Sequence, residues 1–219
     1  MPRTQKDFAP RKEKLIQIAL DQFLEKGYEN TTITDLQKVF GLTKGGMYHY
    51  FSGKEEILDA VIEKGLGDLI DEWRSHLKDL PEKDWLLYVC FTDTANSFSS
   101  RLLQYGRGGE SSIVTYKLRE QRMKMLVPLV TEIIKQYIDS GFYTCDYPEE
   151  MAEILLMVAV STGDQIFGHA TDVDQQARRV DAIVTLWKNC VHPPESHLVE
   201  LRDNLNRFYE NCMADCTNK

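Results

Sequence analysis

Residues 31–58 read TTITDLQKVFGLTKGGMYHYFSGKEEIL, and this stretch decides which fold the chain can adopt. Thr32 and Asp35 have the spacing of a capping box, in which Asp takes the place of the usual Glu. They predict a short helix that ends at Gly41, because glycine is the usual residue just after a helix. Two residues later, Thr43 is a candidate N-cap for the next helix. The stretch therefore predicts two short helices joined by a tight turn.

Further helices are expected on both sides of this pair. The second short helix covers residues 44–51, and after the break at Ser52 and Gly53 a long helix runs over residues 54–77. An earlier helix ends at Gly27. Its apolar side chains fall at helical spacing along one stripe, which consists of Leu15, Ile16, Ala19, Leu20, Phe23 and Leu24.

The rest of the chain also has the hydrophobic spacing of helices. The predicted helices cover residues 83–102, 116–140, 148–170, 174–191 and 195–213. Strand alternation, repeats and low-complexity tracts are not found. We therefore predict an all-α fold, with an N-terminal three-helix domain over residues 1–54 that is linked through the helix at 54–77. A larger helical domain covers residues 55–219.

The charge of the chain is unevenly distributed. The 219 residues are 42% hydrophobic, enough for a sizeable core, and carry a net charge of -8. Residues 1–54 hold nine Lys or Arg against six Asp or Glu, whereas the remainder holds 17 against 28. The N-terminal domain is thus basic and can face nucleic acid, while the acidic remainder favours solubility.

Cysteine usage and the N-terminal sequence indicate where the protein works. The five cysteines are an odd number scattered along the chain, which does not suggest a disulfide framework. The N-terminus lacks the apolar core of a signal peptide, and the longest apolar runs are far too short to span a membrane. We therefore expect a cytoplasmic protein.

The two short helices have the dimensions of a helix-turn-helix, whose second helix enters the major groove of DNA. Gly45 and Gly46 are adjacent in that helix, where each glycine costs about 1 kcal/mol relative to alanine. Without side chains, the helix N-terminus can approach base edges with its backbone N–H groups. Lys44 can reach a guanine or a phosphate. The alternative is that the glycines mark a poorly formed turn.

Three consecutive polar aromatic residues, Tyr48, His49 and Tyr50, follow in the same helix. Since consecutive residues point about 100° apart on a helix, one face cannot bury all three. The exposed ones can donate hydrogen bonds to phosphates. We predict that Met47 and Phe51 are core residues, and Tyr50 is about equally well explained as a core residue. Without the surrounding motif, His49 would be interpreted as an ordinary surface residue.

The stretch from Thr31 to Leu58, extended back to about Arg11, resembles the DNA-binding domain of the tetracycline-repressor (TetR) family. The resemblance covers roughly the first quarter of the chain. It implies a homodimeric repressor that reads a palindromic operator in double-stranded DNA and is released by a small-molecule effector.

The resemblance also implies roles for individual residues. It places Thr32 at a phosphate and Tyr48, His49 and Lys54 at the DNA backbone. Base edges are assigned to Thr34, Lys44, Gly45 and Gly46. Together with Thr43 and Tyr50, these residues are the candidate DNA-binding set.

The C-terminal domain offers weaker candidates. Polar, methionine and aromatic side chains of the kind that line adaptable pockets are Trp85, Phe91, Asp93, Phe98, Tyr105, Tyr116, Met123 and Met157. For most of them an ordinary core position is the competing interpretation, and for Asp93 an exposed face or an interface. Apolar faces on the helices at 148–170 and 174–191, which the family pairs in its dimer, give the candidate interface Ile154, Val158, Ile166, Val180, Ile183, Val184 and Trp187.

Two other classes of function compete with this prediction. An enzyme is excluded because no catalytic constellation, phosphate loop or His-x-x-x-His spacing is found, and we expect no cofactor and no metal. Cys212 and Cys216, with Cys190 and His192, could suggest metal ligation, but ordinary thiols fit better. A ligand-independent DNA-binding or chromosome-organising protein on the same scaffold stays open.

Overall fold

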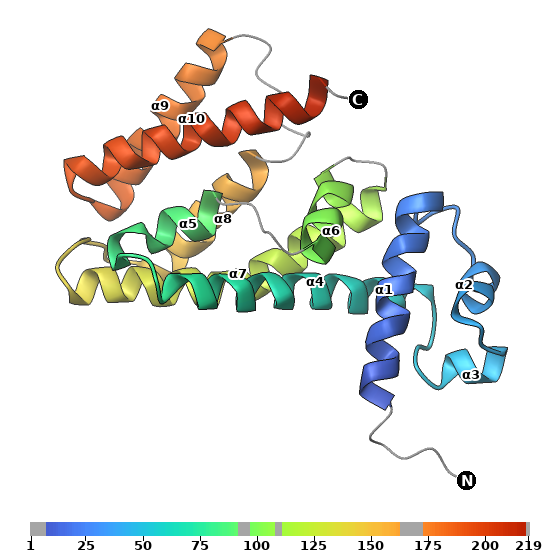
Figure 1. The fold of residues 1–219 in the computed structure, drawn as a ribbon. Coiled ribbons are helices and arrows are strands. Elements are labelled where there is room, and N and C mark those ends of the chain that lie inside the picture. Colours follow the sequence, from blue (N-terminus) through green and yellow to red (C-terminus); the bar gives the residue numbers. More distant parts are fainter. Residues whose placement is uncertain (1–7, 92–96, 108–110, 163–172, 218–219) are drawn as a thin grey trace. The chain divides into compact units, whose positions relative to one another are not determined.

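A computed structural model of the chain describes residues 8–91, 97–107, 111–162 and 173–217 (Figure 1). Every secondary-structure element within these ranges is a helix, so the predicted all-α fold class is confirmed. The chain forms two compact units. The first comprises Met1–Leu69 and Ala95–Gln121, and the second comprises Ile70–Thr94 and Arg122–Lys219.

The first unit begins with the helices predicted from the opening stretch. They are α1 (Phe8–Lys26), α2 (Ile33–Phe40), α3 (Lys44–Tyr48) and α4 (Lys54–Leu77), the last of which extends into the second unit. The α4 bounds agree with the prediction at both ends. Helix α3 is shorter than predicted, because the Met47 carbonyl accepts hydrogen bonds from the Tyr50 and Phe51 N–H groups at 2.8 and 3.0 Å. These bonds close α3 with a tight turn.

The core of this unit is built from the stripe that the sequence predicts on α1. The buried side chains are Leu15, Ile16, Ala19, Leu20 and Phe23 of α1, Leu36 and Phe40 of α2, Met47 of α3 and Ile57, Leu58, Val61 and Ile62 of α4. Helix α6 (Ser97–Arg107) packs closely on α4, because the Ser99 hydroxyl donates to the Gly65 carbonyl at 2.8 Å. A Cβ atom on Gly65 would lie 2.4 Å from Leu102 Cδ2, so any larger residue here would have to displace the Leu102 side chain.

The second unit contains the remaining helices. They are the 3-10 helix η2 (Glu82–Asp84), α5 (Trp85–Phe91), α8 (Pro148–Thr162), α9 (Val173–Val191) and α10 (Glu195–Thr217), with most of α7 (Ser112–Asp139). The single helix predicted over 83–102 is wrong, because η2, α5 and α6 are separate elements. The sequence TDTAN between α5 and α6 is rich in residues that favour helix ends over helix interiors.

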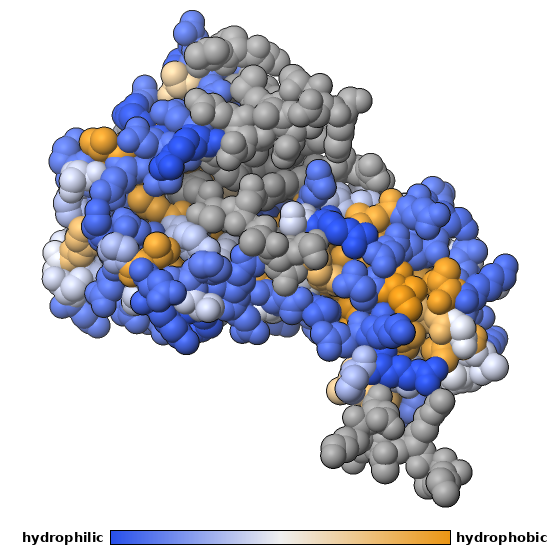
Figure 2. Space-filling model, viewed as in Figure 1, coloured by the Kyte–Doolittle hydropathy of each residue, from blue (hydrophilic) through white to orange (hydrophobic). Residues whose placement is uncertain are grey.

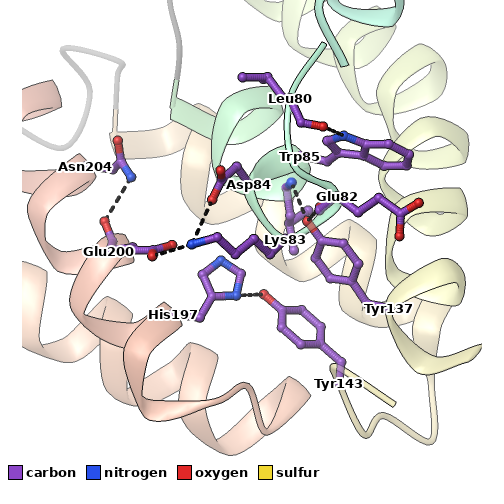
Figure 3. Close-up of polar contacts among 11 residues, drawn as sticks. Leu80, Glu82, Lys83, Asp84, Trp85, Tyr137, Tyr143, His197, Glu200 and Asn204 are labelled. Carbon is purple, nitrogen blue, oxygen red and sulfur yellow. Dashed lines mark hydrogen bonds and ion pairs between the residues drawn. The ribbon is translucent and has the colours of Figure 1, made fainter. Parts of the chain in front are cut away.

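Buried aromatic residues tie this second unit together (Figure 3). The Tyr137 hydroxyl donates to the Glu82 carbonyl and accepts from the Leu86 N–H at 3.1 Å, which satisfies a free group at the start of α5. Within the described residues, no helix is long and apolar enough to cross a membrane.

The Tyr143 hydroxyl lies 3.1 Å from Nδ1 of His197 and accepts a hydrogen bond from Trp187 Nε1 at 3.2 Å. These contacts join the loop after α7 to α9 and α10. This cluster could not be predicted from sequence spacing, because its members are far apart in the chain.

Candidate nucleic-acid interface

Local hydrogen bonds fix the two short helices as the sequence predicts. The Thr32 hydroxyl accepts from the Asp35 N–H at 3.1 Å, and the Asp35 carboxylate accepts from the Thr32 N–H at 2.9 Å, so the capping box is present. Gly41 ends α2 in the left-handed conformation at φ 61°, which glycine adopts without strain. The Thr43 hydroxyl then caps α3 by accepting from the Gly46 N–H at 3.2 Å.

Helix α3 is held by one buried side chain. Met47 is completely buried, and the neighbouring Phe51 is nearly so, with its ring centroid 6.4 Å from that of Phe40 on α2. The first turn faces solvent: Lys44 and Gly45 are exposed and Gly46 is half-buried. A five-residue helix anchored on one face therefore presents its N-terminus outward.

The structure gives no internal reason for glycine at position 45. A Cβ atom there would meet nothing within 4 Å, and the backbone is not in the left-handed region. At Gly46 a Cβ atom would lie 3.3 Å from the Thr43 hydroxyl oxygen, so that glycine also protects the helix cap. The fold thus explains Gly46 in part and leaves Gly45 unexplained.

The aromatic run at the end of α3 divides into exposed and packed residues. Tyr48 is 49% exposed, and His49 is exposed and packs edge-on against Phe8, with ring centroids 5.3 Å apart. Tyr50 is half-buried and stacks on Phe8, with ring centroids 4.8 Å apart. Phe8 was missed by the sequence analysis, although it lies seven residues before Leu15 and so on the same face of α1.

Lys54 and Thr32 already have partners in the protein. Lys54 Nζ donates to the Tyr28 carbonyl at 3.0 Å and lies 4.2 Å from the centre of the Tyr28 ring. The Thr32 hydroxyl donates to the Asp35 carboxylate at 2.7 Å. Thr34, by contrast, is exposed. Within the candidate set, Thr34, Lys44, Gly45, Tyr48 and His49 are the residues most open to a partner, and their DNA contacts stay a prediction.

The candidate pocket residues fall in both compact units. Phe98 and Tyr105 on α6 are buried in the first unit, where the Tyr105 hydroxyl accepts from the Tyr28 N–H. Tyr116 is 66% exposed. In the second unit, Trp85 and Met123 are half-buried and Met157 is 58% exposed. Asp93 and the side chain of Phe91 lie outside the described residues, so the predicted pocket stays a prediction.

The candidate interface residues also differ in exposure. On α8, Ile154 is 38% exposed and Val158 is half-buried, whereas Ile166 lies outside the described residues. The α9 residues Val180, Ile183, Val184 and Trp187 are all buried within the second unit. Among the side chains that the structure describes, which exclude Cys212 and Cys216, no three His, Cys, Asp or Glu could hold a metal ion.

Comparisons with known proteins agree with this geometry. The family model described as bacterial regulatory proteins, tetR family, matches residues 15–61. The uncharacterized HTH-type transcriptional regulator YfiR of Bacillus subtilis is 34% identical over 183 residues, which cover 79% of this chain and 86% of YfiR. The match therefore extends well beyond the DNA-binding segment.

Other relatives match in part of their sequence or in fold. The HTH-type transcriptional repressor KstR2 of Rhodococcus jostii is 34% identical over 64 residues, so this chain spans only 31% of that relative. The crystal structure of RolR in complex with its ligand resorcinol has a TM-score of 0.62 at 15% identity. The similarity covers 93% of this chain and 97% of RolR and concerns the fold alone.

Proposed function

This chain belongs to the TetR family of transcriptional regulators, and on that premise we propose how it regulates. As a homodimer it binds a palindromic operator and represses transcription, and a small-molecule effector releases it from DNA. Members of this family are DNA-binding regulators and not enzymes, in agreement with the sequence analysis. The effector part of the proposal is supported by the fold shared with RolR, whose structure contains resorcinol.

The proposal rests mainly on Gly45, for which the fold gives no internal reason. It costs helix stability, yet a Cβ atom would meet nothing within 4 Å. A glycine that the fold does not need is explained by an external surface that comes close to the backbone. The base edges of a major groove are such a surface, and the N–H groups at the start of α3 are the donors that would face it.

The surroundings of Gly45 suit a polyanion that is read by its bases. Lys44 supplies a positive charge beside the helix N-terminus, and Tyr48 and His49 supply exposed donors one turn further along. Contacts with phosphates position a protein on DNA, whereas contacts with base edges provide sequence specificity. A two-fold dimer presents two such helices about 34–36 Å apart, which requires an operator with dyad symmetry.

The proposal is tested with a duplex that the wild-type protein enriches from a random-sequence library. The enriched sequence is expected to be an inverted repeat. Gly45→Ala should weaken its binding by about 1–2 kcal/mol, because the added methyl group separates the helix from the bases. Binding to a scrambled duplex should change little, since the phosphate contacts are kept.

The same substitution should leave the protein at least as stable, because alanine favours a helix more than glycine does. Gly67→Ala, also in open space but on α4, is the matched control and should not affect DNA binding. Unchanged operator affinity for Gly45→Ala, or equal losses on the two duplexes, would contradict a role at the bases. The effector part of the proposal is tested with compounds that raise the melting temperature of the protein, which should also release it from the operator.

A further inference from the structure

A segment far along the chain belongs to the compact unit that contains the helix-turn-helix. Residues Ala95–Gln121 pack with Met1–Leu69, although the sequence analysis assigned them to the C-terminal domain. Polar contacts from this segment reach the turn between α1 and α2. Their centre is Tyr28, which lies in that turn and is 4% exposed.

Tyr28 is held from three directions. Its backbone N–H donates to the Tyr105 hydroxyl of α6 at 2.7 Å in a buried hydrogen bond, and its carbonyl accepts from Lys54 of α4 at 3.0 Å. Its ring packs edge-on against Phe23 of α1, with centroids 5.2 Å apart. The turn is thus fixed to α6, α4 and α1 at one residue.

Neighbouring contacts reinforce the same attachment. The Ser111 hydroxyl donates to the Glu29 carboxylate at 2.8 Å, next to Tyr28 in the turn. Lys117 of α7 pairs with Asp59 at 2.7 Å and Glu55 at 2.9 Å in the first turns of α4. Hydrogen bonding to Asp59 raises the pKa of Lys117 above its usual value, so the ammonium group stays charged. These contacts fix the start of α7 against the turn and against the start of α4.

Hydrogen bonds within the turn position the start of α2. The Thr31 N–H donates to the Tyr28 carbonyl at 3.1 Å, and the Thr31 hydroxyl donates to the Gly27 carbonyl at 2.8 Å. Thr32, the next residue, is the N-cap of α2. Any shift of the Tyr28 backbone therefore reaches the N-terminus of α2 within four residues.

We propose that Tyr105 is a positioning residue for operator binding, whose hydroxyl holds the Tyr28 amide and thereby the N-terminus of α2. The inference rests on the proposed function. Tyr105 need not touch DNA. Its hydroxyl keeps the helix-turn-helix in the arrangement that fits the operator. Without the hydroxyl, the buried Tyr28 N–H would lose its hydrogen-bond partner, and other arrangements of the turn would become more populated.

Tyr105→Phe removes this hydroxyl and keeps the ring. Apparent affinity falls with the fraction of molecules in the competent arrangement, so binding of the library-enriched duplex should weaken roughly three- to tenfold. The slope of log affinity against log salt should stay unchanged, since no phosphate contact is removed. Amide hydrogen exchange at Tyr28 should accelerate.

Tyr147→Phe, which removes the hydroxyl of a side chain that is 65% exposed and belongs to none of the candidate sites, is the matched control and should leave all three measurements unchanged. Binding is measured at a temperature where circular dichroism shows each variant fully folded, so that a loss of stability alone cannot lower affinity. Operator binding by Tyr105→Phe within twofold of wild type would overturn the proposal, and so would unchanged exchange at Tyr28. A wild-type protein that enriches no duplex would contradict the proposed function instead.

Discussion

At the scale of single residues, Asp35 organises the start of α2. Its carboxylate accepts hydrogen bonds from Lys26 Nζ at 2.6 Å and from both the N–H and the hydroxyl of Thr32. The hydrogen bond from Lys26 is the largest of the effects that lower the pKa of Asp35 below its usual value. Because the Thr32 hydroxyl is committed to Asp35, we expect backbone N–H groups and Thr34 to meet any phosphate there.

His197 provides a prediction for the pH dependence of stability. The side chain is 3% exposed, and burial lowers its pKa to about 4 from the usual 6.5. Between these values the unfolded chain binds a proton that the folded protein excludes. The free energy of unfolding should therefore fall as the pH falls from 6.5 toward 4, by about 1 kcal/mol per pH unit from this group.

The measurement compares urea unfolding of the wild type and His197→Gln across this pH range. The wild type should lose more stability on acidification than the variant, which has no imidazole to protonate. His76→Gln is the control, because His76 is exposed. Equal pH slopes for the wild type and His197→Gln would show that burial does not perturb His197.

At the scale of elements, the two glycines of α4 should respond oppositely to the same substitution. A Cβ atom on Gly65 would lie 2.4 Å from Leu102 and 3.4 Å from Phe98, both buried on α6, whereas one on Gly67 would meet nothing within 4 Å. Gly67→Ala should stabilise the protein by about 0.5–1 kcal/mol through helix propensity. Gly65→Ala should destabilise it by about 1–2 kcal/mol, because overpacking outweighs that gain.

Thermal unfolding of the two variants measures this contrast. An increase in melting temperature for both would mean that Leu102 moves aside without cost and that α6 does not pack tightly on α4. A decrease for both would mean that Gly67 has a role outside the contacts described above.

The elements also show which parts of the structure follow from local sequence. Caps and helix spacing involve residues a few positions apart, so Thr32, Gly41 and Thr43 predicted the ends of α2 and the start of α3 correctly. The same rules could not identify the bond between Tyr28 and Tyr105, whose residues are 77 positions apart. The helix predicted over 83–102 followed its apolar spacing alone, although the sequence TDTAN within it is rich in residues that favour helix ends.

At the scale of the whole molecule, the proposed dimer needs an apolar surface that the subunit leaves exposed. The candidate α9 side chains are buried within the second unit, so α8 offers the stronger candidates. Among the α8 side chains that the structure describes, the exposed apolar ones are Ile154 and Met157, at 38% and 58%. Among the residues coloured in Figure 2, hydrophilic ones predominate, which makes exposed apolar side chains of this size informative.

Met157→Glu should therefore dissociate the dimer if α8 lies in the interface. A two-fold axis brings the two copies of such a helix together, so a new carboxylate is desolvated next to its counterpart in the partner. The dimer dissociation constant should rise at least about tenfold, or 1.4 kcal/mol, in sedimentation at micromolar concentration.

Val199→Glu is the matched control, because Val199 on α10 is 56% exposed and belongs to the same unit as Met157. It should leave the dimer intact. Operator binding should become more steeply dependent on protein concentration for Met157→Glu alone, since a dissociated protein must assemble before it can occupy two half-sites. If Val199→Glu dissociates the dimer and Met157→Glu does not, the interface lies on α10 and not on α8. A wild-type protein that sediments as a monomer would contradict the proposed dimer.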